Sequence, residues 1–192
     1  MRRVMVIPVY YSRPKSEGHQ DGDSVYDHPT PIDEDGTLKR TLESIRIIKN
    51  QDFQLVILVS PTSEELTDRA KEKVNKILSE VNLDIQTFIF TPAELEKIKA
   101  LATEQDVEKS VIKLMNIRGY ANVRNMCIYT AYILGAEMAM LIDDDELFEK
   151  EDFVDLASQY IGGRLYGKTI DGVAGYYLNK YGNYYDDVDI EP

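Results

Sequence analysis

The sequence contains few of the residues that cross-link or anchor a chain. It has one cysteine, no tryptophan and two histidines among 192 residues. A single cysteine, Cys127, excludes an internal disulfide, which fits a reducing compartment. No stretch approaches the roughly 20 apolar residues of a membrane span, and residues 1–9 lack the cleavage site of a signal peptide. We therefore expect a cytoplasmic protein without a transmembrane segment.

Positive charge is also scarce. The chain has 22 basic and 34 acidic residues, a formal net charge of −12. Such a surface repels the phosphates of nucleic acids and anionic lipids, so neither is an expected partner. An anionic ligand would need a bound cation or a local cluster of basic side chains. The length and the hydrophobic content of 43% suit one domain with a sizeable core, which we predict to span residues 1–192.

Apolar runs and helical periodicities alternate along the chain. Continuous apolar segments predict buried strands at residues 4–9, 53–59, 84–90 and 138–142. Apolar residues at helical spacing predict helices at residues 38–48, 123–134 and 153–160, and capping boxes at Thr62 and Thr91 predict two more helix starts. Residues 94–116 are charged and also predicted to be helical. The resulting β-α-β-α-β-α-α-β order predicts an α/β fold, a mostly parallel sheet with helices on both faces. Residues 172–177 and 184–188 then predict a terminal β-hairpin.

A long polar segment, residues 11–35, leaves the first predicted strand. Loops of this length are usually functional or disordered. We expect it to be too polar to build its own core, to be mobile without a ligand, and to become ordered when a ligand binds at the carboxyl end of the sheet. Its two histidines, His19 and His28, are expected to be solvated rather than metal ligands. Cys127, on the inner stripe of a predicted helix, is expected to be a packed core thiol.

Four consecutive acids, residues 143–146, follow directly on the last predicted strand. Carboxylates so close together repel one another, and a hard divalent cation such as Mg²⁺ or Mn²⁺ would offset that repulsion. If the strand continues, Asp143 and Asp145 point to one face. The alternative interpretation is a solvated turn that caps the next helix.

A second signal is the segment from Arg118 to Asn125. It places Arg124 near the start of a predicted helix, and an arginine beside a helix N-terminus favours phosphate binding. The alternative is that Arg124 pairs with one of the many surface acids.

Several segments together resemble family 2 glycosyltransferases of the GT-A fold. They are residues 7–10 (IPVY), 38–45 (LKRTLESI), Gly119 with Arg124-Asn125, Ala131 with Gly135-Ala136, and residues 141–145 (LIDDD). The resemblance runs from residue 4 to about residue 177 and implies a Rossmann-like GT-A sheet. It implies a DXD motif at Asp143-Asp144-Asp145, whose first Asp lies near the nucleotide ribose and whose last binds the metal on the diphosphate. It also implies that Arg124 lies near the diphosphate and that Pro8, Val9 and Tyr10 contact the base.

The implied function is that of a glycosyltransferase. Such an enzyme would bind a UDP- or GDP-linked sugar through Mn²⁺ or Mg²⁺, with Asp143, Asp144 and Arg124 on the nucleotide sugar and Asp145 and Asp143 on the metal. It would pass the sugar to an acceptor hydroxyl with inversion, using a base that the sequence does not identify. Residues 60–63 (SPTS) replace the acidic turn that family members carry after the second strand, and we expect the chain to lack a C-terminal acceptor-binding region.

Two alternatives belong to other functional classes. A sugar-phosphate nucleotidyltransferase shares the α/β layout but needs a glycine-rich phosphate loop after the first strand, and Gly18, Gly22 and Gly36 are too widely spaced for one. A non-catalytic metal- or nucleotide-binding domain would keep the fold and the acidic motif without turnover.

Overall fold

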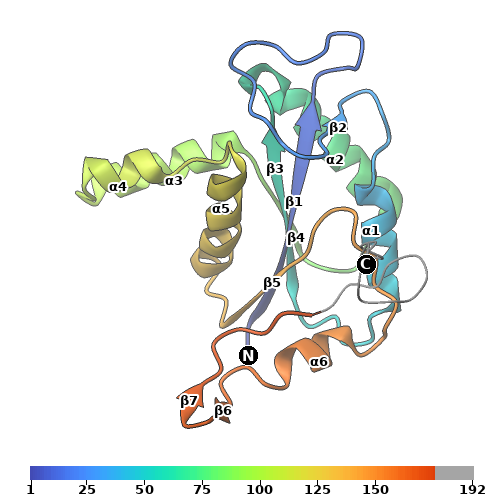
Figure 1. The fold of residues 1–192 in the computed structure, drawn as a ribbon, viewed down its shortest axis with the longest axis vertical. Coiled ribbons are helices and arrows are strands. Elements are labelled where there is room, and N and C mark those ends of the chain that lie inside the picture. Colours follow the sequence, from blue (N-terminus) through green and yellow to red (C-terminus); the bar gives the residue numbers. More distant parts are fainter. Residues whose placement is uncertain (176–192) are drawn as a thin grey trace, which may run out of the picture.

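A computed structural model describes residues 1–175, and these form an α/β fold around one parallel sheet (Figure 1). Its strands are β1 (Arg3–Ser12), β2 (Thr30–Pro31), β3 (Gln54–Pro61), β4 (Thr87–Phe90) and β5 (Met138–Leu141). The order is β2-β1-β3-β4, and β5 pairs with the first half of β1. Every pair in this sheet is parallel. All four predicted strands are confirmed. The apolar runs of β1 and β3 are buried between two layers of helices, whereas β4 is partly buried and β5 alternates between buried and exposed residues.

Helices cover both faces of the sheet, as predicted (Figure 1). On one face lie α1 (Leu38–Ser44), α2 (Thr67–Val81) and α6 (Phe153–Ser158), which share a core with the side chains of Met5, Ile7 and Val9. On the other face α3 (Pro92–Glu104) and α5 (Tyr120–Ile133) pack against Val4 and Val6. The remaining helical elements are the short α4 (Lys109–Leu114) and the 3-10 turns η1 (Ile45–Ile47) and η2 (Glu64–Leu66).

The two predicted capping boxes have different outcomes. At Thr91 the box is confirmed: its side chain accepts from the Ala93 amide, and the Glu94 carboxylate accepts from the Thr91 backbone amide. At Thr62 the prediction is wrong. The helix proper begins only at Thr67, after η2, and the Thr62 hydroxyl is buried without a hydrogen-bond partner among residues 1–175. The backbone amide of Thr62 instead donates to the Tyr11 carbonyl, which extends the β1–β3 ladder.

Only the first residues of the predicted terminal hairpin belong to the described part of the chain. Residues 172–175 are not in a strand, and the rest of that hairpin lies outside the described residues. A different antiparallel hairpin precedes it, formed by β6 (Arg164–Leu165) and β7 (Lys168–Thr169). Tyr166 and Gly167 turn it with φ angles of 50° and 78°, the left-handed pair that tight hairpins require. Within residues 1–175, no helix is long and apolar enough to cross a membrane.

Candidate site at the carboxyl edge of the sheet

One edge of β1 is shared by two strands that leave a gap between them. β5 pairs with residues 3–6 of β1, and β2 pairs with Tyr11 and Ser12. Between them, residues 7–10 of β1 have no strand partner on that edge within the described chain. The gap opens where β5 ends and the acidic residues begin. Ligands of open α/β sheets bind at such carboxyl ends, where neighbouring strands diverge.

Pro8 is suited to this gap because proline has no backbone N–H to donate. The Val6 carbonyl accepts from Ile142 and the Ser12 carbonyl accepts from Ile32, so even-numbered residues of β1 direct their backbone toward the β5 and β2 edge. The ring nitrogen of Pro8 therefore faces the gap, where no ladder hydrogen bond is lost. The carbonyls of Pro8 and Tyr10 face the same space.

The strand boundary predicted at this point is wrong. β1 continues to Ser12, so Pro8 and Val9 lie inside a strand rather than at the start of a loop. The Val9 side chain is fully buried in the α1–α2 core, which leaves it no surface to offer a ligand. Only Tyr10 is half-buried, with its ring on the α5 side. Contact of this segment with a nucleotide base stays a prediction, and it now depends on the backbone and on Tyr10.

Arg124 and Asp143, which carry the two separate sequence signals, are in contact. The Arg124 Nη2 atom lies 2.6 Å from Oδ1 and 2.8 Å from Oδ2 of Asp143. Both side chains are partly exposed, at 30% and 41%. Burial alone would lower the pKa of Arg124, but its hydrogen bonds to Asp143 and Tyr120 outweigh burial and raise that pKa. The alternative interpretation of Arg124 as the partner of an acid is thus confirmed, and its partner is the first acid of the run.

Aromatic rings surround this pair. Arg124 also donates to the Tyr120 hydroxyl at 3.0 Å and lies over the Tyr120 ring, 5.2 Å from its centroid. The rings of Tyr10 and Tyr120 are stacked with their centroids 6.4 Å apart, and the centroids of the Tyr26 and Tyr10 rings are 4.5 Å apart. The buried Tyr10 hydroxyl has no hydrogen-bond partner among the described residues. The site thus combines the positive charge of the Arg124 guanidinium with an aromatic surface.

The acids form a turn, so the expectation that Asp143 and Asp145 share a strand face is wrong. β5 ends at Leu141, and the Glu146 amide donates to the Asp143 carbonyl. The Glu146 carboxylate accepts from the Asp143 amide at 2.8 Å. The turn directs Asp143 toward α5, leaves Asp145 exposed and turns Asp144 to the opposite side.

Asp144 is held by α1. The Thr37 hydroxyl donates to its carboxylate at 3.1 Å, and the Thr41 hydroxyl donates to its carbonyl at 2.6 Å. Burial raises the pKa of Asp144 to about 6, although the Thr37 hydrogen bond acts in the opposite direction. The neighbouring Asp145 charge adds to the rise. Protonation of Asp144 therefore changes closer to neutral pH than that of an ordinary aspartate.

A metal ion has no ready-made cage here. In residues 1–175, no three His, Cys, Asp or Glu side chains are grouped to hold one. Asp143 is engaged by Arg124 and Asp144 by Thr37, which leaves the exposed Asp145. This donor set fits a cation that takes only one or two protein carboxylates and completes its shell with phosphate oxygens and water, as Mg²⁺ does. Metal binding by Asp145 and Asp143 stays a prediction.

The long loop, residues 11–35, packs over this edge instead of standing free. Arg13 forms an ion pair with Asp23 at 2.9 Å, and both side chains are nearly buried. Tyr26 is buried, and its hydroxyl lies 2.6 Å from Ser60 Oγ and accepts from the Gly119 amide. The loop builds no core of its own, as expected, but Tyr11, Tyr26 and Ile32 join the two cores of the sheet. Ordering on ligand binding stays a prediction.

The loop also contacts the SPTS segment, residues 60–63, which follows the second predicted strand. Ser60, the first residue of the SPTS segment, is fully buried and donates to the Ile117 carbonyl at 2.6 Å. It holds the loop and the start of α5 together and has no surface toward the gap. His19 and His28 are exposed, and Cys127 is buried in the α5 core, where burial raises its pKa to about 12. The core role expected for Cys127 is confirmed.

Sequence reasoning missed four residues of the site: Thr37, Thr41, Tyr120 and Tyr26. Thr41 carries a usable signal, because it lies on the buried stripe of α1 beside Leu38 and Leu42 yet is polar. A buried hydroxyl needs a partner, and here that partner is the acid turn. Nothing in the sequence pattern indicates that Thr37 or Tyr26 approaches the site. In the comparisons, no family model, no curated protein and no solved structure matches this chain.

Proposed function

We propose that this protein is a glycosyltransferase that binds a nucleotide-diphosphate sugar at the β1 gap. The observation that carries the proposal is the Arg124–Asp143 contact beside that gap. It joins a cation suited to phosphate with an acid suited to a metal, at the edge of a parallel sheet where ligands bind. The resemblance of the IPVY and LIDDD segments to family 2 glycosyltransferases supports the same conclusion.

Binding would exchange one ion pair for two. In the free protein Arg124 and Asp143 neutralise each other. A diphosphate that arrives with Mn²⁺ or Mg²⁺ offers the guanidinium a phosphate partner and the carboxylate a metal partner. Charge-assisted hydrogen bonds to phosphate are among the stronger polar contacts. The exposed Asp145 makes no hydrogen bond or ion pair with the rest of residues 1–175, so it can join the metal without losing one.

The nucleoside would lie along the aromatic side of the gap. The half-exposed Tyr120 ring offers a face for stacking, and the Pro8 and Tyr10 carbonyls offer acceptors to a base edge. These groups discriminate only weakly between bases, so we propose UDP- and GDP-sugars as a class rather than one of them.

In the reaction, the acceptor oxygen bonds to the anomeric carbon as the bond from that carbon to the diphosphate oxygen breaks. The acceptor proton passes to a general base. Arg124 stabilises the negative charge that develops on the leaving diphosphate. A bound divalent cation would supply Lewis-acid neutralisation of the same oxygens.

A titration of the chain with UDP- and GDP-sugars, with and without Mn²⁺, tests the proposal. We expect binding that requires both metal and diphosphate, followed by sugar transfer or slow donor hydrolysis. Binding without any turnover would favour the non-catalytic domain. Turnover of a nucleoside triphosphate with a sugar phosphate would indicate the nucleotidyltransferase instead. If no sugar nucleotide binds in the presence of Mn²⁺, the proposal is wrong.

A further inference from the structure

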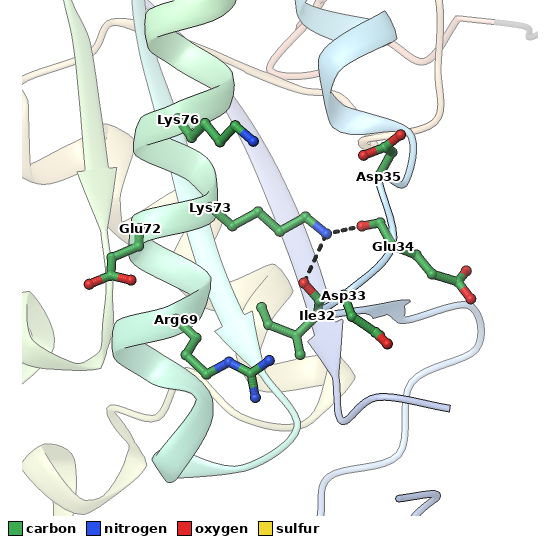
Figure 2. A pocket seen from close by; sticks show the side chains of 8 residues that line it. All are labelled: Ile32, Asp33, Glu34, Asp35, Arg69, Glu72, Lys73 and Lys76. Atoms are coloured by element: carbon green, nitrogen blue, oxygen red, sulfur yellow. Dashed lines mark hydrogen bonds between the residues drawn. The ribbon is translucent and has the colours of Figure 1, made fainter. Parts of the chain in front are cut away.

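Lys73 connects α2 to the segment that follows β2. Its Nζ atom donates to the backbone carbonyls of Pro31 at 3.5 Å and Ile32 at 3.2 Å, and also to that of Glu34. Figure 2 shows the side chain crossing from the helix to this segment. The ammonium also lies over the Tyr11 ring, 5.2 Å from its centroid. One lysine on a helix thus fixes a stretch of chain at the carboxyl edge of the sheet.

These contacts use all three donors of the ammonium. The surrounding cavity, of about 340 Å³, is lined by basic side chains of α2 and by the acids of residues 33–35. Because three carbonyls already saturate Lys73, it has no proton left for an anionic ligand. Burial lowers the pKa of Lys73, which the nearby acids Asp35, Asp33 and Glu34 partly oppose. A charge taken partly out of water is costly, and here the three carbonyls compensate for it.

The segment that Lys73 holds leads straight to Asp144. Residues 31–34 run into Gly36, whose φ of 71° and close approach to Thr30 leave no room for a side chain. Thr37 and Thr41 follow and donate to the carboxylate and the carbonyl of Asp144. Tyr11 is a second link between Lys73 and Asp144. The Lys73 ammonium lies over its ring, and the Asp144 charge is the second cause, after burial, that raises the pKa of Tyr11.

We propose that Lys73 is a positioning residue for the nucleotide-sugar site. By tying the carbonyls of residues 31–34 to α2, it fixes where Thr37 and Thr41 hold Asp144 and so sets the shape of the acid turn. The expected effect on binding rests on the proposed function. The link from Lys73 to Asp144 does not depend on it.

The link can be measured without a ligand, using Lys73→Met and the control Lys76→Met. Lys76 lines the same cavity one turn along α2 but makes no hydrogen bond to residues 31–34 (Figure 2). We expect Lys73→Met to speed amide exchange over residues 32–41 by roughly 10- to 100-fold, given the worth of charge-assisted hydrogen bonds. It should also shift the carboxyl ¹³C resonance of Asp144. Lys76→Met should do neither.

If Lys73→Met unfolds the chain, Lys73→Gln, which keeps a donor, is measured in its place. An Asp144 resonance and exchange rates equal to those of Lys76→Met would overturn the proposal.

Binding supplies the second readout through a double-mutant cycle. We expect Lys73→Met to weaken Mn²⁺-dependent UDP affinity by about 2- to 30-fold, and this loss to disappear when Asp144→Asn is already present. A loss of the same size in both backgrounds would show that Lys73 does not act through Asp144, which contradicts the proposal. If UDP does not bind the parent chain at all, the proposed function fails, while the exchange and resonance measurements still decide the role of Lys73.

Discussion

Replacing Arg124 by alanine tests the central contact of the site. In the free protein the substitution leaves Asp143 without its cation, but both side chains are partly exposed, at 30% and 41%. Partly exposed ion pairs contribute at most about 1 kcal/mol to stability. We therefore expect Arg124→Ala to remain folded, with only a small decrease in the free energy of unfolding.

The effect on binding should be larger and specific to phosphate. The guanidinium that pairs with Asp143 is free to take a diphosphate oxygen once a metal engages the carboxylate. Loss of one charge-assisted hydrogen bond costs about 1.5–3 kcal/mol, which corresponds to an affinity about 10- to 150-fold weaker. Uridine carries no phosphate, so its affinity should change only through the Tyr120 ring that Arg124 covers.

Isothermal titration with UDP and with uridine, both in Mn²⁺, separates the loss of the phosphate contact from any change at the Tyr120 ring. Arg118→Ala is the matched control, because Arg118 lies just before α5 and pairs with an exposed acid, Glu64, at 3.5 Å. We expect the control to bind both ligands as the parent does. Equal losses for UDP and uridine in Arg124→Ala would refute the reasoning and place Arg124 away from the phosphates.

Three further outcomes are expected. Asp145→Ala should abolish Mn²⁺-dependent UDP binding and leave the melting temperature unchanged or higher, because it removes one exposed charge from a like-charge cluster; unchanged affinity in calorimetry would rule out its metal role. Asp144→Asn should stabilise the fold by up to about 3 kcal/mol at pH 7 and have little effect below pH 3.8. The reason is that the pKa of Asp144, raised to about 6 by folding, makes its ionised form unfavourable in the folded state, and this cost is absent when the carboxyl is protonated in both states. Urea denaturation at the two pH values checks this, and the same stability difference between variant and parent at both would contradict it. Thr91→Val should cost about 1 kcal/mol through loss of the α3 cap, whereas Thr62→Val should be nearly neutral; thermal denaturation of the pair checks both, and equal destabilisation would contradict the assignment.

Much of the fold follows from local patterns, because strands buried on both faces must be continuously apolar. The runs at residues 4–9 and 53–59 predicted β1 and β3 on that basis. The same reasoning stopped β1 too early. Tyr10, Tyr11 and Ser12 break the apolar pattern, yet they stay in the strand. Tyr10 and Tyr11 pair with residues 60–61 of β3, and Ser12 pairs with Pro31 of β2. Pairing between distant segments outweighs local composition there.

The candidate site was predictable in its parts but not in its assembly. Arg124 and Asp143 each carried a signal from residue type and position. Their contact depends on how α5 packs beside β5, which no local pattern encodes. The expectation that Asp143 and Asp145 alternate assumed a strand, whereas a backbone hydrogen bond from Glu146 to Asp143 makes a turn. The hydroxyls that hold Asp144 come from α1, far away in sequence.

The central place of β1 has a consequence for how the chain assembles. β1 pairs with β2 and β3, which follow it soon in the sequence, and with β5, which comes last among the strands of this sheet. Pairings between distant segments form slowly. An intermediate of β1 to β4 would expose the edge at residues 3–6, a template for pairing with other chains. Docking of β5 closes that edge and, in the same event, brings Asp143 to Arg124. A ligand that needs both residues would therefore bind only chains that have completed folding, and would shift the equilibrium toward them by mass action.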